Sequence, residues 1–394
     1  MRSPNVELNL REFEEGSEVL ASTPRDVTLG THNACNAKCV FCLEGDYSRF
    51  NLELYKNFFE AKMGHIIRGA ESVTFTGFGE ILWVPGIEEF LDYINEPLPD
   101  VKKIFTTNGT PLKSPVVERL LTGDYIIQIS LHAANAALHQ KLTQLEGQFE
   151  PILENIRALV ALRTEKRKRL GLEGLNHPHL RLFSVLNAHN IDDVSEFVQQ
   201  AYDLGVQSVR CFYMTMFAPE HIEMSCAFDP ERANRAIRKA MALVERLESR
   251  PGPDHFFKVE LPPLFGEHRA QAPTRCTDPW QYLYVELQGS VQPCCNWGKH
   301  VGNLNQGDSV DGIWNGELYR SLRKGMASGD PLPFCRSCVR YNSYNVDDLL
   351  CHITNRPEAQ RSLLREISRR GLLKAPSPEM LRLLEPAASS PAPL

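Results

Sequence analysis

The chain has 394 residues, with 43 lysines and arginines against 49 aspartates and glutamates, and a formal net charge of -6. This acidic balance excludes nucleic-acid binding through bulk positive charge, and 42% hydrophobic residues exclude disorder of the whole chain. Eleven cysteines are unusual, but the N-terminus lacks the apolar segment of a secretion signal and no apolar run of 18 residues occurs. We therefore expect a cytoplasmic protein whose cysteines bind metal or take part in catalysis.

Between residues 26 and 250, short β-type runs alternate with longer helical patterns. Strands are expected at 26–32, 72–78, 102–108, 125–132, 179–187 and 206–214. Helices are expected at 51–67, 85–94, 114–123, 151–169, 190–205 and 230–248. Six βα units in succession predict an α/β fold with a parallel sheet, in which functional residues lie at the C-terminal ends of the strands.

The pattern changes after about Arg250, where proline and glycine become frequent. A β-hairpin is expected with Gly289 in its turn, followed by helices at 317–329 and 357–373 and a mobile tail rich in Pro, Ala and Ser. The predicted parts are an N-terminal extension (1–25), a core (26–250), a cysteine-rich domain (251–355), and a C-terminal helix with its tail (356–394).

Three cysteines lie close together directly after the first predicted strand. Cys35, Cys39 and Cys42 form a C-x3-C-x2-C motif. Three thiolates can hold a [4Fe–4S] cluster while leaving one iron open to a small molecule. The alternative on spacing alone is a structural zinc site with His32 as the fourth ligand.

The run CNAKCVFC, with Phe41 before the last cysteine, resembles the radical S-adenosylmethionine (radical SAM) superfamily. After the second strand, Gly77-Phe78-Gly79-Glu80 resembles the family's Gly-Gly-Glu motif, which holds the amino group of SAM, although Phe78 replaces the second Gly. The resemblance also places ribose or carboxylate contacts near Asn108 and Ser130, and an adenine contact near Asn187.

This resemblance covers roughly residues 26 to 215 and implies a partial (β/α)6 TIM-type barrel. The implied activity is reductive cleavage of SAM to a 5′-deoxyadenosyl radical, which abstracts hydrogen from a substrate. An external reductase such as flavodoxin or ferredoxin is the implied electron donor. The protein positions the reacting atoms and excludes water.

Four further cysteines form a second constellation: Cys276, Cys294, Cys335 and Cys338. Four thiolates suit either zinc or a second [4Fe–4S] cluster, and Cys295 is an alternative to Cys294 as a ligand. The surrounding sequence resembles the SPASM or shorter Twitch extension of radical SAM enzymes, a small α+β domain. Because Tyr344 stands where a full SPASM domain continues its cysteine series, we expect one auxiliary cluster, fully ligated by four cysteines.

Cys211, Cys226, Cys295 and Cys351 have no assigned ligand role. One of them could donate a hydrogen atom to a product radical, although burial as a small apolar side chain is the more common role. His132 is a candidate to face the substrate, and Tyr213 and Met214 are candidates to line its pocket.

The leading hypothesis is a radical SAM enzyme that oxidises or epimerises a sugar, aminocyclitol or nucleoside-like small molecule in a biosynthetic pathway. A second hypothesis is modification of a ribosomal peptide by a thioether, a crosslink or epimerisation; about 25 residues before the first strand are too few for a leader-recognition domain. A third is a non-catalytic zinc protein with an interaction surface. No membrane or nucleic-acid partner is expected.

Overall fold

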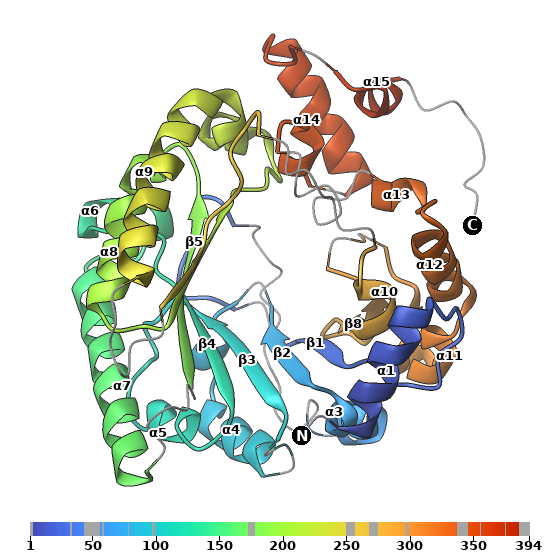
Figure 1. The fold of residues 1–394 in the computed structure, drawn as a ribbon, viewed down its shortest axis with the longest axis horizontal. Coiled ribbons are helices and arrows are strands. Elements are labelled where there is room, and N and C mark those ends of the chain that lie inside the picture. Colours follow the sequence, from blue (N-terminus) through green and yellow to red (C-terminus); the bar gives the residue numbers. More distant parts are fainter. Residues whose placement is uncertain are drawn as a thin grey trace.

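One ten-stranded sheet organises the computed structural model, which describes residues 3–31, 34–42, 56, 59–77, 79–96, 98, 100–171, 178–249, 257–267, 275–295, 297, 299–336, 346–354, 356–374 and 376–385. The strand order is β10-β9-β8-β1-β2-β3-β4-β5-β6-β7. Seven strands from β1 to β7 run parallel in chain order, which confirms the predicted partial barrel (Figure 1).

All six predicted strands are present, each ending slightly earlier than expected. They are β1 (Asp26–Gly30), β2 (Ser72–Thr76), β3 (Lys102–Thr107), β4 (Tyr125–Ser130), β5 (His179–Leu186) and β6 (Ser208–Tyr213), to which β7 (Lys258–Glu260) is added. The connecting helices are α3 (Gly64–Gly69), α4 (Ile87–Asn95), α5 (Val116–Leu120), α6 (Ala136–Thr143), α7 (Phe149–Arg169), α8 (Val194–Asp203) and α9 (Pro230–Glu248), with a π-helical turn at Phe59–Met63. Helix α6 was not predicted.

The two faces of the parallel sheet differ in burial because side chains alternate along each strand. Phe75, Phe105 and Leu182 lie on the buried face, which the helices cover. Thr74, Gln128 and Arg181 lie on the half-buried face. We call the space in front of this second face the lumen of the barrel.

The predicted hairpin around Gly289 is confirmed, and it extends the barrel sheet. Strand β8 (Tyr282–Val285) pairs parallel with β1, matching Asp26 with Tyr282 and Thr28 with Tyr284. Strands β9 (Ser290–Gln292) and β10 (Gly302–Asn303) continue antiparallel from it. Gly289 has φ 81°, a left-handed conformation that favours glycine. Helices α10 (Asp278–Gln281), α11 (Val310–Trp314), α12 (Glu317–Ser328) and α13 (Pro333–Arg336) complete this region.

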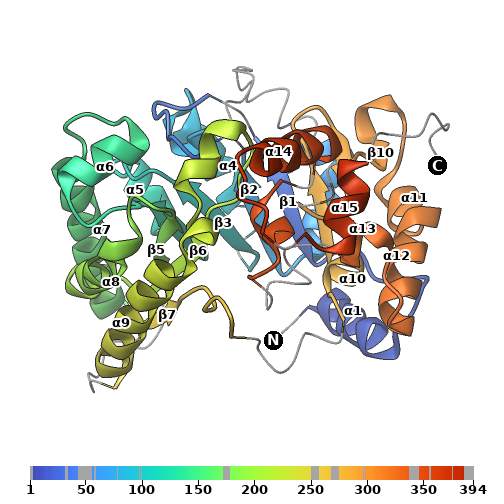
Figure 2. The ribbon, with the colours of Figure 1, turned by 90° about the horizontal axis from the view of Figure 1, so that it is seen from above.

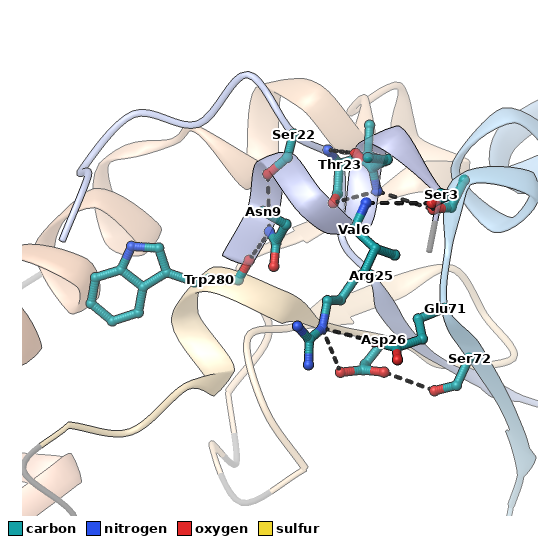
Figure 3. A network of polar contacts seen from close by, with 12 residues as sticks. Ser3, Val6, Asn9, Ser22, Thr23, Arg25, Asp26, Glu71, Ser72 and Trp280 are labelled. Carbon is teal, nitrogen blue, oxygen red and sulfur yellow. Dashed lines mark hydrogen bonds and ion pairs between the residues drawn. The ribbon is translucent and has the colours of Figure 1, made fainter. Parts of the chain in front are cut away.

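The N-terminal strap (residues 3–25) joins this cysteine-rich region to the barrel. It contains helix α1 (Pro4–Glu15), which was not predicted and which begins at the cap residue Ser3. Figure 3 shows its central contact: the buried Asn9 amide donates to the Trp280 carbonyl (2.5 Å) and to the Ser22 hydroxyl (2.9 Å). At the end of the strap, Arg25 pairs with Asp26 and Glu71. The strap therefore spans from α10 to the first residues of β1 and β2.

Large side chains of the cysteine-rich region bind the same strap. The Trp280 indole donates to the Ser17 carbonyl and packs edge-on against Phe13, with ring centroids 5.5 Å apart. Trp314 donates to the Ser22 carbonyl (2.9 Å). Arg323, which is fully buried, donates to the carbonyls of Glu18 and Pro279. These bonds satisfy buried polar groups that would otherwise cost stability.

Helix α14 (Pro357–Arg369) and α15 (Pro378–Leu384) lie beyond the end of β6 (Figure 2). A single parallel bridge joins Met216 to Ile353, and Leu363, Leu364 and Ile367 join a buried cluster that includes Phe41. The prediction that the whole tail is mobile was wrong for α15, because Met380 packs into this cluster. In the described parts of the chain, no helix is long and apolar enough to cross a membrane.

Candidate active site

The three cysteines of the first motif lie in the cluster loop (residues 34–42), which follows β1. The backbone of this loop pairs with the end of α6, since Lys38 donates to the Thr143 carbonyl (3.0 Å) and Val40 to the Leu142 carbonyl (2.9 Å). The Glu80 amide, after β2, donates to the Ala34 carbonyl (2.9 Å). The loop is thus fixed at the C-terminal ends of the strands, where the fold is expected to carry function.

The three thiols of the cluster loop are neighbours and none is in a disulfide. Burial, together with the charges of Cys42 and Cys35, raises the pKa of Cys39 to about 12. Cys42 is exposed, whereas Cys35 and Cys39 are half-buried. Among the described residues, no three Cys, His, Asp or Glu side chains stand in ligating geometry. Three neighbouring thiolates would repel one another, and a cationic iron centre would relieve that repulsion, so the residue set fits a cluster.

Asn108, at the end of β3, holds the cluster loop from below. Its amide donates to the Asn36 carbonyl oxygen (2.7 Å), and its own oxygen accepts from the Thr110 hydroxyl (2.6 Å). The Asn36 amide in turn donates to Thr110 (2.9 Å). A hydrogen bond with Asn108 also partly offsets the burial that raises the pKa of Cys35. Asn108 therefore orients the segment between the first two cysteines.

The buried carboxylate of Glu80 links the segment after β2 to the end of β3. One oxygen accepts from the Leu82 amide (3.1 Å) and the other from the Asn108 amide (2.5 Å). Burial raises the pKa of Glu80 to about 7. A buried acid of this kind is stabilised in its charged form by a nearby cation, so the residue fits the ammonium group of SAM.

Phe41 of the cluster loop packs against His132, which follows β4. Their rings meet edge-on with centroids 4.8 Å apart, and both side chains are buried. The His132 Nδ1 accepts from the Val185 amide (3.2 Å), and burial lowers the pKa of His132 to about 3. His132 is thus a neutral packing residue, and the structure gives it no open face toward a substrate.

The remaining predicted SAM contacts lie along the same edge of the sheet. Ser130 ends β4, half-buried on the lumen face, and Gly77 and Gly79 follow β2. Asn187 caps a turn after β5, donating to the Val185 carbonyl and accepting from the His189 amide. Phe78 and His32 lie outside the described residues.

Three cysteines of the second motif line one small cavity of about 30 Å³, although they are far apart in sequence. Cys276, Cys294 and Cys335 share it with mainly apolar neighbours, which are Pro279, Pro293, Trp297, Leu322, Met326 and Phe334, and with Asp278. We call this the auxiliary cavity. An apolar cavity with several thiols suits a fully ligated iron–sulfur cluster. Cys338 lies outside the described residues.

Cys294 and Cys295 point to different surroundings. Cys294 lines the auxiliary cavity, and its charge contributes to the raised pKa of Tyr319, after burial. Cys295 is exposed, and its charge acts on Tyr282 and Tyr284 of β8. This difference favours Cys294 as the ligand.

The other unassigned cysteines are buried. Cys211 lies on β6 between the lumen-side residues Arg210 and Phe212, so it faces the helices, and burial raises its pKa. Cys226 and Cys351 are also buried, and burial raises the pKa of Cys226 to about 12. Tyr213 and Met214 are buried too, and Tyr213 packs on Phe265.

A second cavity, of about 310 Å³, lies in the lower part of the lumen and was not predicted. Its walls include Gln128, Arg181 and Arg210 on one side, and Asp26, Asp278 and Tyr282 on the other. We call it the lumen cavity. The alternation of polar residues along the predicted strands could have indicated it. Asp278 lines both the lumen cavity and the auxiliary cavity, so the two are neighbours.

Comparison with known proteins agrees with this arrangement. The iron–sulfur cluster-binding domain family SPASM matches residues 276–339. The chain is 25% identical over 350 residues to the mycofactocin maturase MftC of Mycobacterium tuberculosis, covering 87% of this chain and 81% of the maturase. It is 23% identical over 321 residues to the AdoMet-dependent heme synthase of Methanosarcina barkeri, covering 77% of this chain and 86% of the synthase.

The crystal structure of SuiB from Streptococcus suis has a similar fold. It aligns with a TM-score of 0.58 and 15% identity, covering 81% of this chain and 72% of SuiB. SuiB has also been crystallised with S-adenosylmethionine and with its precursor peptide SuiA.

The cluster loop on a partial barrel, joined to a cysteine-lined auxiliary cavity, defines an iron–sulfur enzyme of the radical type. The chain is a radical SAM enzyme with a C-terminal SPASM domain, and its cofactors are SAM and [4Fe–4S] clusters. The third hypothesis, a non-catalytic zinc protein, is therefore wrong.

Proposed function

We propose that this enzyme modifies a peptide substrate by hydrogen-atom abstraction. The observation that carries the hydrogen-abstraction part of the proposal is the position of Asp278, which lines both the auxiliary cavity and the lumen cavity and so makes them neighbours. A substrate in the lumen then has the cluster loop at one end and the auxiliary cavity at its side. SuiB, whose fold is similar, was crystallised with a precursor peptide. This relation supports the peptide hypothesis over the small-molecule hypothesis that the sequence favoured.

In this proposal the cluster loop holds an open cluster through Cys35, Cys39 and Cys42. Gly77 and Gly79 let SAM approach the backbone, Glu80 binds its ammonium group, and Asn108 and Ser130 contact its ribose or carboxylate. Phe41 packs on His132 and so holds the cluster loop in place. Phe78 and Asn187 are the remaining proposed SAM-binding residues. When bound, the cluster and SAM supply a 5′-deoxyadenosyl radical that abstracts hydrogen.

The auxiliary cavity serves net oxidation in this proposal. Cys276, Cys294, Cys335 and Cys338 ligate one cluster fully, so its role is to accept an electron from the substrate rather than to bind the substrate. Burial of three of the four described unassigned cysteines supports oxidation over epimerisation, because a hydrogen-donating thiol has to reach the substrate. A small flavodoxin or ferredoxin is the proposed source of electrons for SAM cleavage.

Oxidation of a small molecule is the second candidate function. The relation to the heme synthase supports it, because that protein is named for a product that is not a peptide. The lumen cavity, at about 310 Å³, holds one residue or one small ring, so its size admits both candidates.

Anaerobic reconstitution tests the proposal. The purified chain, supplied with iron and sulfide, should hold about eight irons. With dithionite, SAM and synthetic peptides encoded beside its gene, it should form 5′-deoxyadenosine and a peptide of altered mass. Deuterium moving from a labelled peptide into 5′-deoxyadenosine identifies the abstracted hydrogen. Deuterium transfer from a labelled sugar or tetrapyrrole, with no peptide altered, would favour the second candidate.

A further inference from the structure

We propose that the lumen cavity is a carboxylate-binding subsite of the substrate, formed by Arg181 of β5 and Arg210 of β6. This inference rests on the proposed function, because it names the chemistry by which the same barrel recognises its peptide. The carboxylate has two possible sources, the C-terminus of the peptide or an acidic side chain.

The two arginines are diagonal neighbours on adjacent strands. Arg181 pairs in register with Ser208, two residues before Arg210, so both side chains lie on the lumen face. Burial and the nearby charge of Arg210 lower the pKa of Arg181. The positive charges of the two side chains therefore oppose each other, and an anion bound to both would reduce that cost.

Arg181 has neutral partners on both sides. Its Nε donates to the Ser208 hydroxyl (3.2 Å), and one terminal nitrogen donates to the Gln128 carbonyl oxygen (3.3 Å). The negative charge of Glu260 partly opposes the lowering of the Arg181 pKa. Glu260 itself forms a salt bridge with Arg210, at 3.1 Å. That pair is largely exposed at the β7 edge of the sheet, so it can open at little cost.

The opposite wall has acids, but at least one of them is already compensated. Asp26 accepts from the Ser72 hydroxyl (2.8 Å) and pairs with Arg25 of the N-terminal strap (3.6 Å). Arg181, whose side-chain hydrogen bonds go to neutral groups, is therefore the charge in this cavity that an added anion would best complement.

The position of the arginines suits a substrate anchor. Gln128, which Arg181 contacts, lies two residues before Ser130 on β4, which is about 7 Å along the strand. A carboxylate held here leaves room for a few bonds between the anchor and the strand ends, where SAM is proposed to bind. The anchor would thus select which C–H bond faces the radical.

Three labelled probes test the subsite by equilibrium binding to the reconstituted chain of 394 residues with SAM present. N-acetyl-alanine has an α-carboxylate, N-acetyl-aspartic acid α-amide has a side-chain carboxylate, and N-acetyl-alaninamide has none. We expect at least one carboxylate probe to bind about tenfold more tightly than the amide, as for one charge-assisted hydrogen bond. The better carboxylate probe identifies the source.

Arg181→Gln and Arg210→Gln should each abolish this preference, and Arg181→Lys should retain part of it because it keeps the charge. Arg238→Gln is the matched control, since Arg238 also pairs with a glutamate but on the outer surface of α9. Equal binding of all three probes, or an unchanged preference in both glutamine variants, would overturn the subsite.

The subsite and the proposed function fail separately. If the protein prefers the carboxylate probes but modifies no peptide, the proposed peptide-modifying function is contradicted and the carboxylate subsite is supported. A modified peptide whose binding ignores both arginines would contradict the subsite and leave the function.

Discussion

The cluster loop and the auxiliary cavity hold their cysteines by different means. Cys35, Cys39 and Cys42 lie within eight consecutive residues, and side-chain amides and short backbone contacts fix their loop. Cys276, Cys294 and Cys335 come from three separate segments, which meet only because the N-terminal strap, β8 and α12 are packed together. The first site is formed by one short segment of the chain, whereas the second forms only when distant segments fold together. Catalysis should therefore be sensitive to changes at the first site, and stability to changes at the second.

The largest expected effect is on catalysis. Replacing Cys35, Cys39 and Cys42 together by alanine should reduce SAM cleavage to background, because no ligands remain for the open cluster. The iron content should fall from about eight to about four per chain, measured anaerobically. The folded far-UV spectrum should persist, because the substitutions leave Phe41 and the backbone hydrogen bonds of the loop in place.

The auxiliary cavity is the matched test of the same comparison. Cys276→Ala/Cys294→Ala should also lose about four irons but keep SAM cleavage without substrate turnover. Cys295→Ala is the control and should keep about eight irons. A loss of iron in Cys295→Ala, with none in Cys294→Ala, would show that Cys295 is the ligand and would contradict the choice of Cys294.

The next effect is on stability through the N-terminal strap. Trp280→Ala should lower the free energy of unfolding by about 3–5 kcal/mol, because it removes a buried indole and its bond to Ser17. Trp83→Ala, which truncates a 54% exposed side chain, should change it by less than about 0.5 kcal/mol. Chemical denaturation of the anaerobic protein measures both. Equal effects would show that the strap does not hold the auxiliary region.

A smaller effect is expected from the amide contacts of the cluster loop. Asn36→Ala removes two hydrogen bonds and should cost about 1–2 kcal/mol locally. Hydrogen exchange should then increase in residues 34–42, and SAM should bind more weakly. Asn305→Ala, which removes a hydrogen bond to Gln288 in the β8–β9 turn, should leave both measurements unchanged.

The smallest effect concerns pH. Burial lowers the pKa of His139, on α6 beneath the cluster loop, to about 4 from 6.5. The unfolded chain therefore binds a proton below pH 6.5 that the folded chain does not, so stability is lost as pH falls from 6.5 toward 4. His139→Phe should reduce this loss by about 1 kcal/mol at pH 5.5. An identical decline of Tm with pH in both proteins would contradict this assignment.

Local patterns predicted the strands, the hairpin turn at Gly289 and helix α9, whose observed ends match the predicted ones. The cysteine spacing and the polar strand ends also placed most of the candidate site. Helix α1 was missed because its stability comes from Asn9 and its contacts with Trp280, 271 residues away. The lumen cavity was missed because Arg181 and Arg210 meet only when β5 and β6 pair in register. Non-local packing determines such features, and no single segment shows it.

The pairing of β8 with β1 has a consequence for how the chain matures during synthesis. The cluster loop follows β1, yet one edge of β1 stays open until residues 282–285 leave the ribosome. More than 70% of the 394 residues are made before that edge closes, and an open strand edge invites wrong pairing. The nascent protein therefore depends on a late segment to finish its earliest strand.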